Sequence, residues 1–175
     1  MTAGINRRVL LLAGLGGGLT GCGFRPVYAP VGDGPGPSPA LAAIEVKPIY
    51  ERPGQILREA LKARLANDSG VPHRFDLQVN FWIAGEGLGI LTGTQVTRIR
   101  LIARATWVLT KQDALQSKLA EGGERVNDGF DTFDSQFLAI DMQNEKVQRR
   151  MAEKMAEQIG LRLAMWFHQH PDAAG

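Results

Sequence analysis

The sequence is poor in features that would assign a function by themselves. It has one cysteine in 175 residues, so no disulfide can form within the chain and packing alone must hold the fold together. Twenty basic residues stand against 18 acidic residues, which gives a formal charge of only +2. Such a near balance of positive and negative charge disfavours nucleic acid as the main partner, and any electrostatic function must come from local clustering of charge.

Long apolar runs are scarce as well. The uncharged run from Val9 to Gly18 has about ten residues, whereas a membrane-spanning helix needs about 20. It follows the basic start Asn6-Arg7-Arg8 and leads into small residues, which is typical of a secretory signal peptide. We therefore expect residues 1–21 to be a signal peptide, and its removal would leave equal numbers of basic and acidic residues.

The single cysteine lies at the end of this signal. Leu19-Thr20-Gly21-Cys22 resembles a lipobox, in which the cysteine thiol receives a diacylglycerol and becomes the mature N-terminus. We expect Cys22 to be lipidated, because a lone cysteine in an exported protein otherwise needs another explanation. The alternative is an ordinary signal peptide followed by an unpaired thiol.

Residues 22–41 are expected to be the acylated cysteine and a tether. Prolines and glycines alternate from Ala29 to Ala40, a composition that opposes both helix and sheet. One folded domain is expected over residues 42–170, which is long enough for a real core, and residues 171–175 are expected to be a tail.

Helical spacing of apolar residues predicts two helices in that domain. The first starts near Pro53, runs from Gln55 to Ala66 and is expected to end with Gly70 as a left-handed cap. The second is expected from about Ser135 until Pro171 ends it. Its apolar face comprises Val147, Met151, Met155, Ile159, Leu163 and Trp166.

Strict alternation predicts strands. A short strand at residues 44–46 ends before Pro48, and the clearest alternation runs from Arg74 to Ile83. Gly85 to Gly93 is expected to be a loop that turns near Gly89 and joins this strand to a long one over residues 94–110. A strand of that length calls for a bulge or a protruding end.

Residues 119–133 are interpreted as a fourth strand, with Val126, Phe130 and Phe133 toward the core. The order strand, helix, three strands, helix then predicts an α+β fold. This fold is a two-layer sandwich, in which a mostly antiparallel four-stranded sheet carries two helices on one face.

No arrangement of catalytic or metal-binding residues emerges. His73, His168 and His170 lack the spacing of metal ligands, and the glycine-rich stretches lack the strand-to-helix setting of a phosphate loop. No serine lies in a nucleophile-elbow context. The sequence therefore predicts neither an enzyme nor a cofactor or metal site.

Arginines are the best candidates for a binding site. Arg98, Arg100 and Arg104 alternate on one face of the long strand, and a turn near Gly89 would bring Arg74 onto the same face. Arginine forks bind phosphate bidentately, as an anionic lipid head group requires. The alternatives are a solvated sheet face or contact with an acidic partner surface.

Apolar residues in polar surroundings are candidates for partner contact. Trp82 lies on the polar side of its strand, and an exposed aromatic side chain often anchors an interface. Leu88, Ile90 and Leu91 lie in the expected glycine loop. Met151 and Met155 could line a soft lipid groove, although their helical spacing favours the core.

A family resemblance follows from the order of these motifs. Cys22-Gly23-Phe24-Arg25-Pro26, the tether, the helix with Leu57-Arg58-Glu59-Ala60-Leu61, and the long closing helix together resemble the LPS-assembly lipoprotein (LptE) family. Ser135-Gln136-Phe137-Leu138-Ala139 is similar to its alphaproteobacterial members.

The resemblance implies a lipoprotein anchored on the periplasmic side of the outer membrane. Such a protein sits inside the LPS-assembly β-barrel protein (LptD-type), plugs it and helps to deliver lipopolysaccharide to the outer leaflet. The family also suggests basic loops for LPS phosphates, but Gly85 to Gly93 has no Lys or Arg, so those contacts do not transfer position by position. The alternative function is a substrate-binding auxiliary lipoprotein of another periplasmic lipid transport system.

Overall fold

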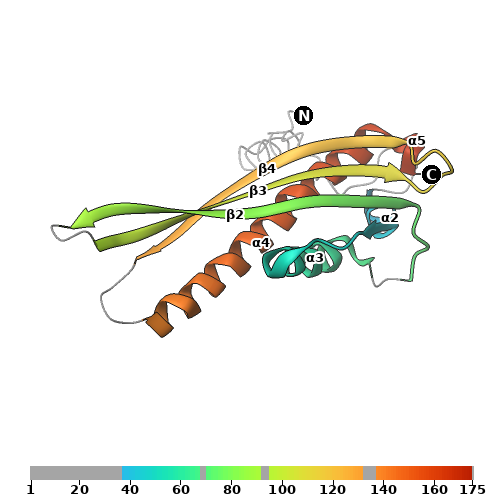
Figure 1. The fold of residues 1–175 in the computed structure, drawn as a ribbon. Coiled ribbons are helices and arrows are strands. Elements are labelled where there is room, and N and C mark those ends of the chain that lie inside the picture. The colour runs from blue at the N-terminus through green and yellow to red at the C-terminus, as the bar shows by residue number, and fades with distance from the viewer. Residues whose placement is uncertain (1–36, 68–69, 92–94, 132–136, 175) are drawn as a thin grey trace, which may run out of the picture.

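The computed structural model describes residues 37–67, 70–91, 95–131 and 137–174, with the backbone alone at 37–38, 88–91, 95–97, 131, 137–141 and 174. The elements in chain order are α2 (Pro37–Ala42), β1 (Ile44–Val46), α3 (Glu51–Leu65), β2 (Phe75–Leu91), β3 (Gln95–Lys111), β4 (Lys118–Asp131), α4 (Phe137–Gln169) and α5 (Pro171–Ala174). Figure 1 shows the long strands in one layer and the helices α3 and α4 along one side of it.

The sheet has the spatial order β1-β2-β3-β4. β2 pairs with β3, and β3 with β4, in antiparallel orientation, whereas the three residues of β1 run parallel to β2. A parallel pair requires a crossover, and α3 supplies it between β1 and β2. The predicted α+β fold with a mostly antiparallel four-stranded sheet is thus confirmed, with one parallel pair.

The core lies between the inner face of the sheet and the two long helices. Its strand residues are Ile44, Val46, Phe75, Leu77, Val79, Leu101, Ala103, Ala105, Trp107, Leu109, Val126 and Phe130. They pack against Leu57, Leu61 and Leu65 of α3 and against Val147, Met151, Met155, Ile159, Leu163 and Phe167 of α4. The periodicities used to predict these elements therefore reflect burial. Met151 and Met155 are fully buried core residues and line no lipid groove.

The hairpin turns later than expected. β2 continues through the glycines to Leu91, and its register with β3 stays constant, so that Gly85 lies opposite Leu101 and Gly87 opposite Ile99. A Cβ atom on Gly85 would lie 3.4 Å from Leu101 Cδ2, which is an ordinary van der Waals contact. The prediction of a loop at residues 85–93 that turns near Gly89 was wrong, because the β2–β3 ladder continues through these glycines.

The long strands show both features expected from their length, a bulge and a protruding end. The register between β3 and β4 shifts between Leu109 and Thr110. The β2–β3 hairpin also extends well past the end of α3, toward the left of Figure 1. We call this end of the sheet, which holds residues 82–91 of β2 and 95–104 of β3, the distal end.

The folded domain begins earlier than predicted. α2 lies inside the stretch expected to be a tether, and Ala40 and Leu41 belong to the core. Prolines at the first and third positions of a helix are tolerated, because the first backbone N–H groups have no partner within the helix anyway. Residues 1–36, which include Cys22, lie outside the described residues.

The helix boundaries also differ in detail. α3 ends with Ala66 in the left-handed conformation, and the Ala66 N–H donates to the Lys62 carbonyl, so Gly70 is not the cap. α4 has 33 residues and ends just before Pro171, as predicted. The predicted fourth strand corresponds to β4, with Val126 and Phe130 buried, whereas Phe133 lies outside the described residues. None of the helices in the described ranges is both long and apolar enough to cross a membrane.

Candidate functional site

A row of arginines lies on the sheet face opposite the helices. Arg98, Arg100 and Arg104 are exposed, whereas Leu101 and Ala103 between them on β3 are buried against the helices. Side chains two residues apart on a strand project to the same side at about 7 Å spacing, so this row is roughly 20 Å long. The three arginines predicted to share a face do share it.

A fourth arginine joins the row from the neighbouring strand. Arg125 on β4 lies directly opposite Arg104 in the register and is exposed. Residues directly opposite in an antiparallel pair have Cβ atoms about 5 Å apart, and two like charges there are destabilising. The Arg125 Nε–H donates to Asn127 Oδ1 at 3.2 Å, which leaves the charge itself without compensation from that contact.

Arg125 was not among the residues singled out from the sequence. The signal that could have found it is parity: with Val126 and Phe130 toward the core, the odd positions of the fourth strand must face the other way. That inference also needs the β3–β4 register, which places Arg125 beside Arg104. We call Arg98, Arg100, Arg104 and Arg125 together the arginine face.

The arginine face carries a marked excess of positive charge. Glu86 of β2 lies opposite Arg100, and Asp131 of β4 lies opposite Arg98 in the register. On this face, which α3 and α4 do not cover, four arginines therefore stand against two acidic residues. A surface of this kind suits a ligand with more than one anionic oxygen cluster, since each guanidinium can bind a phosphate in a bidentate manner.

β4 is held in place by ion pairs to α4 on its inner side. The Arg150 Nε–H and Nη2–H donate to the Asp128 carboxylate at 2.6 and 2.9 Å, and the Arg162 Nε–H donates to Glu124 Oε1 at 3.1 Å. Hydrogen bonds from Arg150 and from the Gly129 N–H hold the pKa of Asp128 below its ordinary value, although burial opposes them. These two pairs flank Arg125 and fix the strand that presents it.

Arg74 lies far from the arginine face. It precedes Phe75 at the opposite end of β2, eight residues from Trp82, which corresponds to about 26 Å along the strand. The Arg74 Cζ atom lies 5.3 Å from the centroid of the Phe75 ring, at a distance typical of a cation–π contact. The expected grouping of Arg74 with the other three is therefore not found, because the chain turns later than Gly89 and the strands are longer.

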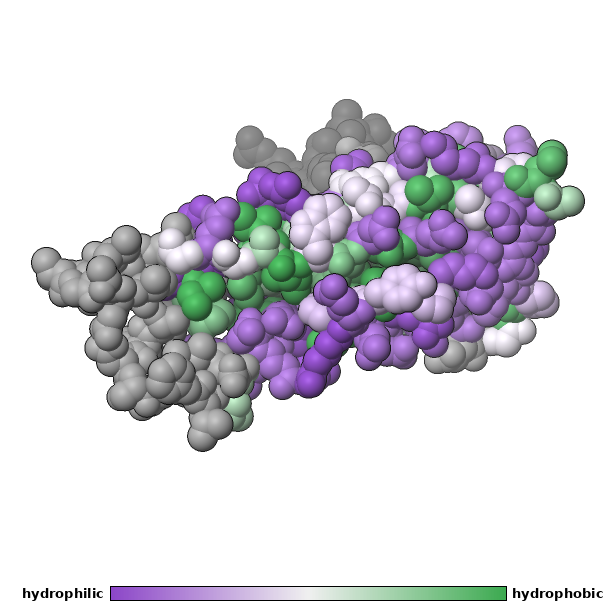
Figure 2. Space-filling view, viewed as in Figure 1, coloured by the Kyte–Doolittle hydropathy of each residue, from purple (hydrophilic) through white to green (hydrophobic). Residues whose placement is uncertain are grey.

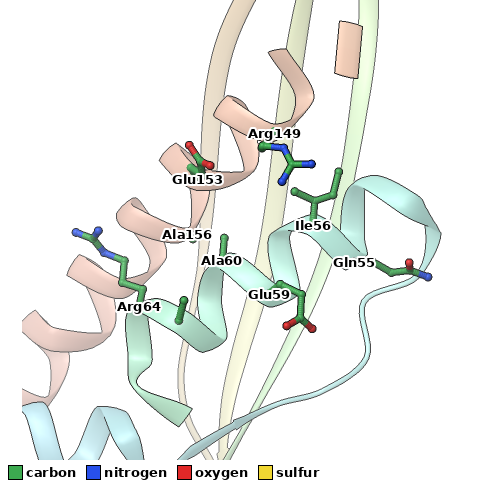
Figure 3. A pocket seen from close by; sticks show the side chains of 9 residues that line it. Gln55, Ile56, Glu59, Ala60, Arg64, Arg149, Glu153 and Ala156 are labelled. Carbon is green, nitrogen blue, oxygen red and sulfur yellow. The ribbon is translucent and has the colours of Figure 1, made fainter. Parts of the chain in front are cut away.

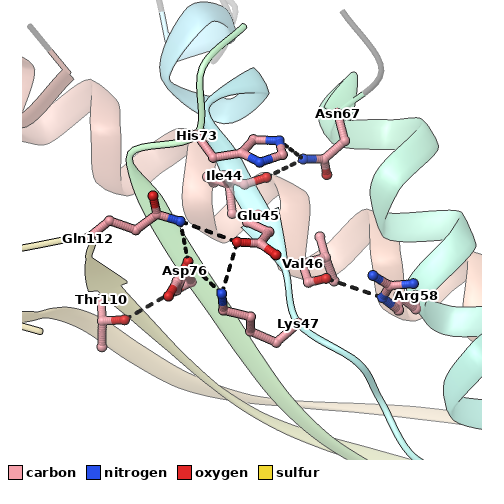
Figure 4. Close-up of polar contacts among 10 residues, drawn as sticks. All are labelled: Ile44, Glu45, Val46, Lys47, Arg58, Asn67, His73, Asp76, Thr110 and Gln112. Carbon is pink, nitrogen blue, oxygen red and sulfur yellow. Dashed lines mark hydrogen bonds and ion pairs between the residues drawn. The ribbon is translucent and has the colours of Figure 1, made fainter. Parts of the chain in front are cut away.

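The sheet end near Arg74 has a different electrostatic character. Lys47 Nζ lies 2.9 Å from Glu45 Oε2 and 3.1 Å from Asp76 Oδ1, and the Gln112 side-chain amide donates to both carboxylates (Figure 4). The hydrogen bond to Glu45 is the main cause that raises the pKa of Lys47. Here the cation is compensated by two carboxylates, so this end offers no comparable site for an anion.

The candidates for partner contact lie on the distal half of β2. Trp82 is 45% exposed and stands opposite Arg104 on the arginine side of the sheet. Leu88, Ile90 and Leu91 belong to β2 by their backbone, but their side chains lie outside the described residues. A half-exposed tryptophan beside an arginine is a combination that is enriched in the energetic centre of interfaces.

A groove lies between α3 and α4, away from the arginine face. This groove has a volume of about 660 Å³ and a floor of small and aliphatic residues that includes Ile56, Ala60 and Ala156 (Figure 3). Arg64 and Arg149 lie toward its two ends, and Arg64 is paired with Glu157 at 3.3 Å. The groove can hold apolar material, but charges of both signs line its rim.

Among the described residues, no group of three or more His, Cys, Asp or Glu side chains is placed to hold a metal ion. What the described surface does offer is an anion-binding face, an exposed tryptophan and a shallow apolar groove. Each of these suits binding of a ligand or a partner.

Comparison with known proteins gives this surface a context. The family model of lipopolysaccharide-assembly proteins, LptE, matches residues 41–163. No curated protein matches the chain. Among solved structures, a lipoprotein from Caulobacter crescentus CB15 is 27% identical, with a TM-score of 0.57 over 74% of this chain and 93% of that one.

Two further structures share the fold at lower identity. A minor lipoprotein from Acinetobacter baumannii is 16% identical, with a TM-score of 0.51 over 69% of this chain and 89% of its own. The rare lipoprotein B from Shewanella oneidensis is 13% identical, with a TM-score of 0.52 over 69% of this chain and 91% of its own. The family is non-enzymatic, in agreement with the absence of catalytic motifs from the sequence. From the family match over most of the domain, the chain belongs to the LptE family of lipopolysaccharide-assembly lipoproteins.

Proposed function

We propose that this protein is the lipid-anchored component of an outer-membrane LPS translocon. In this role it sits within the LPS-assembly β-barrel protein, plugs the barrel and assists the transport of lipopolysaccharide to the outer leaflet. Family membership supports a role in LPS assembly in general. We propose in addition the barrel partner, the outer-membrane location and the residues that contact LPS and the barrel.

The observation that carries the proposal is the arginine face. Its four arginines lie on the sheet face opposite α3 and α4, at the end that extends beyond α3. A lipid A head group carries phosphates on a sugar scaffold, so a row about 20 Å long can engage it at more than one point. The arginine face would therefore bind the phosphates while the lipid passes.

The energetics suit transient binding. A hydrogen bond to a charged group contributes roughly 1.5–3 kcal/mol when water is partly excluded, and an exposed ion pair contributes less than about 1 kcal/mol. All four arginines are exposed, so each contact is weak alone and the set is strong enough to select an anionic lipid. A lipid that must be released again requires such intermediate affinity.

The remaining candidates complete the proposal. Cys22 would carry the diacylglycerol, whose two acyl chains would give stable membrane attachment, since one chain alone gives only marginal binding. Trp82, together with Leu88, Ile90 and Leu91 at the distal end, would contact the barrel protein. Arg74 would contact LPS only separately from the arginine face, because about 26 Å of strand lies between them.

The test has two arms, which use the full-length processed lipoprotein in detergent. In the first, the tagged protein is expressed in its own host with the LPS-assembly β-barrel protein, and the proposal expects the two to co-purify in a fixed ratio. In the second, Arg98, Arg100 and Arg104 are replaced together by Gln, which removes the charges and keeps much of the side-chain bulk. Affinity for purified LPS should fall at least tenfold, and added salt should narrow the difference between variant and parent.

A matched control removes three exposed cations from the helix side. Arg52, Lys146 and Arg149 are replaced by Gln, which changes the net charge by the same amount. This variant should bind LPS nearly as well as the parent. Equal losses of LPS affinity in both triple variants would mean that only net charge matters. No loss of affinity in the Arg98, Arg100 and Arg104 variant would mean that the arginine face is an ordinary solvated surface. LPS binding by a lipoprotein that does not co-purify with the barrel protein would favour the alternative of an auxiliary substrate-binding lipoprotein.

A further inference from the structure

Within the part of the chain that the structure describes, β2 has a long edge without a partner strand. β1 pairs with residues 75–77 only, and the last ladder bond on this side is the one from the Lys47 N–H to the Leu77 carbonyl. β2 then continues to Leu91 with β3 on its other side, and no described strand lies against its outer edge from Gln78 onward. Figure 1 shows β2 passing beyond the end of α3 with this edge uncovered by any labelled element. We call residues 79–87 of β2 the open edge.

The hydrogen bonds of the sheet identify which backbone groups point outward. The Lys47 N–H donates to the Leu77 carbonyl at 3.0 Å, so odd-numbered residues of β2 turn their polar groups toward the outer side. The Gln112 N–H donates to the Arg74 carbonyl at 2.8 Å, so even-numbered residues face β3. Because the β2–β3 register is constant, this alternation continues along the strand. Phe81, Ile83 and Gly85 therefore present N–H and C=O groups at the open edge.

The open edge lacks the features that usually keep a strand edge from pairing. From Val79 to Gly87 it contains no Pro, Lys or Arg, and Glu86 is its one charged residue. Natural sheets protect exposed edges with charges, prolines, bulges or a covering element. The opposite edge, on β4, has such protection, because Glu124 and Asp128 are tied to arginines of α4.

The surroundings of the open edge are apolar and partly hollow. Phe81 and Ile83 are only half-buried although they point to the core side, and Trp82 is 45% exposed on the other side. Figure 2 shows hydrophobic surface along the middle of the molecule, between hydrophilic regions. A groove of about 290 Å³ lies where the open edge begins, lined by residues that include Pro48, Tyr50, Val79 and Asn80.

We propose that the open edge takes up an extended segment of the partner β-barrel protein as an added strand, an inference that rests on the proposed function. An outward row of alternating N–H and C=O groups is satisfied by another extended backbone. The added strand would have apolar side chains on the core side, which cover Phe81 and Ile83, and a bulky side chain that enters the groove beside Tyr50. Its residue next to Glu86 would be basic or polar.

A second copy of this chain fits the open edge less well. Antiparallel pairing sets residues of like parity opposite each other, so self-pairing about a two-fold axis at Trp82 or at Ile83 would place Glu86 of one copy opposite Gln78 or Asn80 of the other. A carboxylate would then lie at the groove, where Lys47 is already compensated by Glu45 and Asp76. The groove therefore favours a strand of different sequence.

The first experiment measures hydrogen–deuterium exchange at single residues by electron-transfer fragmentation, for the lipoprotein alone and in its complex with the barrel protein. In the free protein, the amides of Phe81, Ile83 and Gly85 should exchange fast and those of Trp82 and Ala84 slowly. In the complex the alternation should disappear, because the odd-numbered amides gain acceptors. The amides of β4 are the internal control and should not change.

The second experiment deletes one outward donor. Gly85→Pro removes the outward N–H and places the ring on the open edge without removing a bond to β3, and proline is tolerated on edge strands. Gly85→Ala is the matched control, since it keeps the N–H and its Cβ would make only an ordinary contact with Leu101. The Pro variant should co-purify with the barrel protein at least tenfold less, at unchanged thermal stability, and the Ala variant should co-purify normally.

The outcomes separate this inference from the proposed function. A complex that forms while the odd-numbered amides stay fast, or that tolerates Gly85→Pro, overturns the added strand and leaves the translocon role intact. If the parent protein does not bind the barrel at all, the proposed function fails and the added strand fails with it. Protection of the open edge in the lipoprotein alone, growing with its concentration, would show self-pairing and also overturn the proposal.

Discussion

The Asp128–Arg150 ion pair offers a direct measure of how firmly β4 is held to α4. Asp128→Asn keeps the shape of the side chain, but its amide nitrogen must then face the Arg150 guanidinium, so one of the two bonds at 2.6 and 2.9 Å becomes a contact between donors. The Asp128 side chain is only 16% exposed, whereas that of Arg150 is 49% exposed.

The exposed fractions of these two side chains determine how much stability the substitution should cost. A bond to a charged group contributes about 1.5–3 kcal/mol, and solvent reduces this toward the 0.2–1 kcal/mol of a surface pair. Because Asp128 is largely covered and Arg150 is half exposed, we expect the free energy of unfolding at pH 7 to fall by about 1–2 kcal/mol. Urea denaturation at constant ionic strength would measure it, since the slope should stay unchanged.

The pH dependence gives this prediction its sign. The pKa of Asp128 is lowered in the folded protein, chiefly by Arg150, so its contribution is present above the unfolded pKa near 3.8 and is lost as the pH falls through the folded pKa. The difference between parent and variant should therefore be full at pH 6–7 and shrink below about pH 4. Equal differences at pH 7 and at the lowest pH where the fold survives would refute this reasoning.

A matched pair provides the control. Arg52 and Glu145 are 2.8 Å apart, about as close as the Asp128 pair, but their side chains are 75% and 49% exposed. Glu145→Gln should change the free energy of unfolding by less than about 0.5 kcal/mol, because solvent screens an exposed pair. If both substitutions cost the same, burial does not decide the strength of these pairs.

Two further substitutions test the core and the anchor. Gly122→Ala would set a Cβ atom 2.6 Å from Trp107 Cζ2, so the buried ring must move; unfolding experiments should show a loss of about 1–3 kcal/mol and near-ultraviolet circular dichroism a changed tryptophan band. An unaltered band at full stability would contradict this close packing. Cys22→Ala should leave a precursor that carries no glycerolipid, and mass spectrometry that finds an unmodified Cys22 in the native mature protein would rule the anchor out.

The sequence predicted best those elements whose periodicity directly reflects burial. Leu57, Leu61 and Leu65 follow the helical repeat of α3, and Phe75, Leu77 and Val79 follow the alternation of β2; all six are buried. Over the 33 residues of α4 the same repeat loses accuracy. It placed Trp166, which is partly exposed, on the apolar face and missed Phe167. The Phe167 side chain is 2% exposed, and its ring centroid lies 5.2 Å from that of Phe75. The apolar stripe of a long helix drifts, because 3.6 residues per turn do not match a fixed step.

Features that depend on pairing between distant residues could not be predicted. Glycines in a run usually indicate a loop, and only the register, which sets Leu101 opposite Gly85 and Ile99 opposite Gly87, shows that these glycines belong to a strand. The same limit hid Arg125, whose position beside Arg104 follows from the β3–β4 register. The misplaced turn also grouped Arg74 with the distal arginines. Alternation settles which face a residue occupies, whereas register settles which residues meet.

The proportions of the fold explain why its candidate sites gather at one end. β2 and β3 have 17 residues each, about 56 Å of strand, whereas the 15 residues of α3 cover about 22 Å. α3 therefore supports less than half of β2, and beyond it the sheet bears both an open edge and the arginine face. If the distal end served only solubility, interspersed charges of both signs would avoid the repulsion between Arg104 and Arg125. An anion on the arginine face and a strand on the open edge would each add a contact at this end, which is why the two proposals fall on the same half of the sheet.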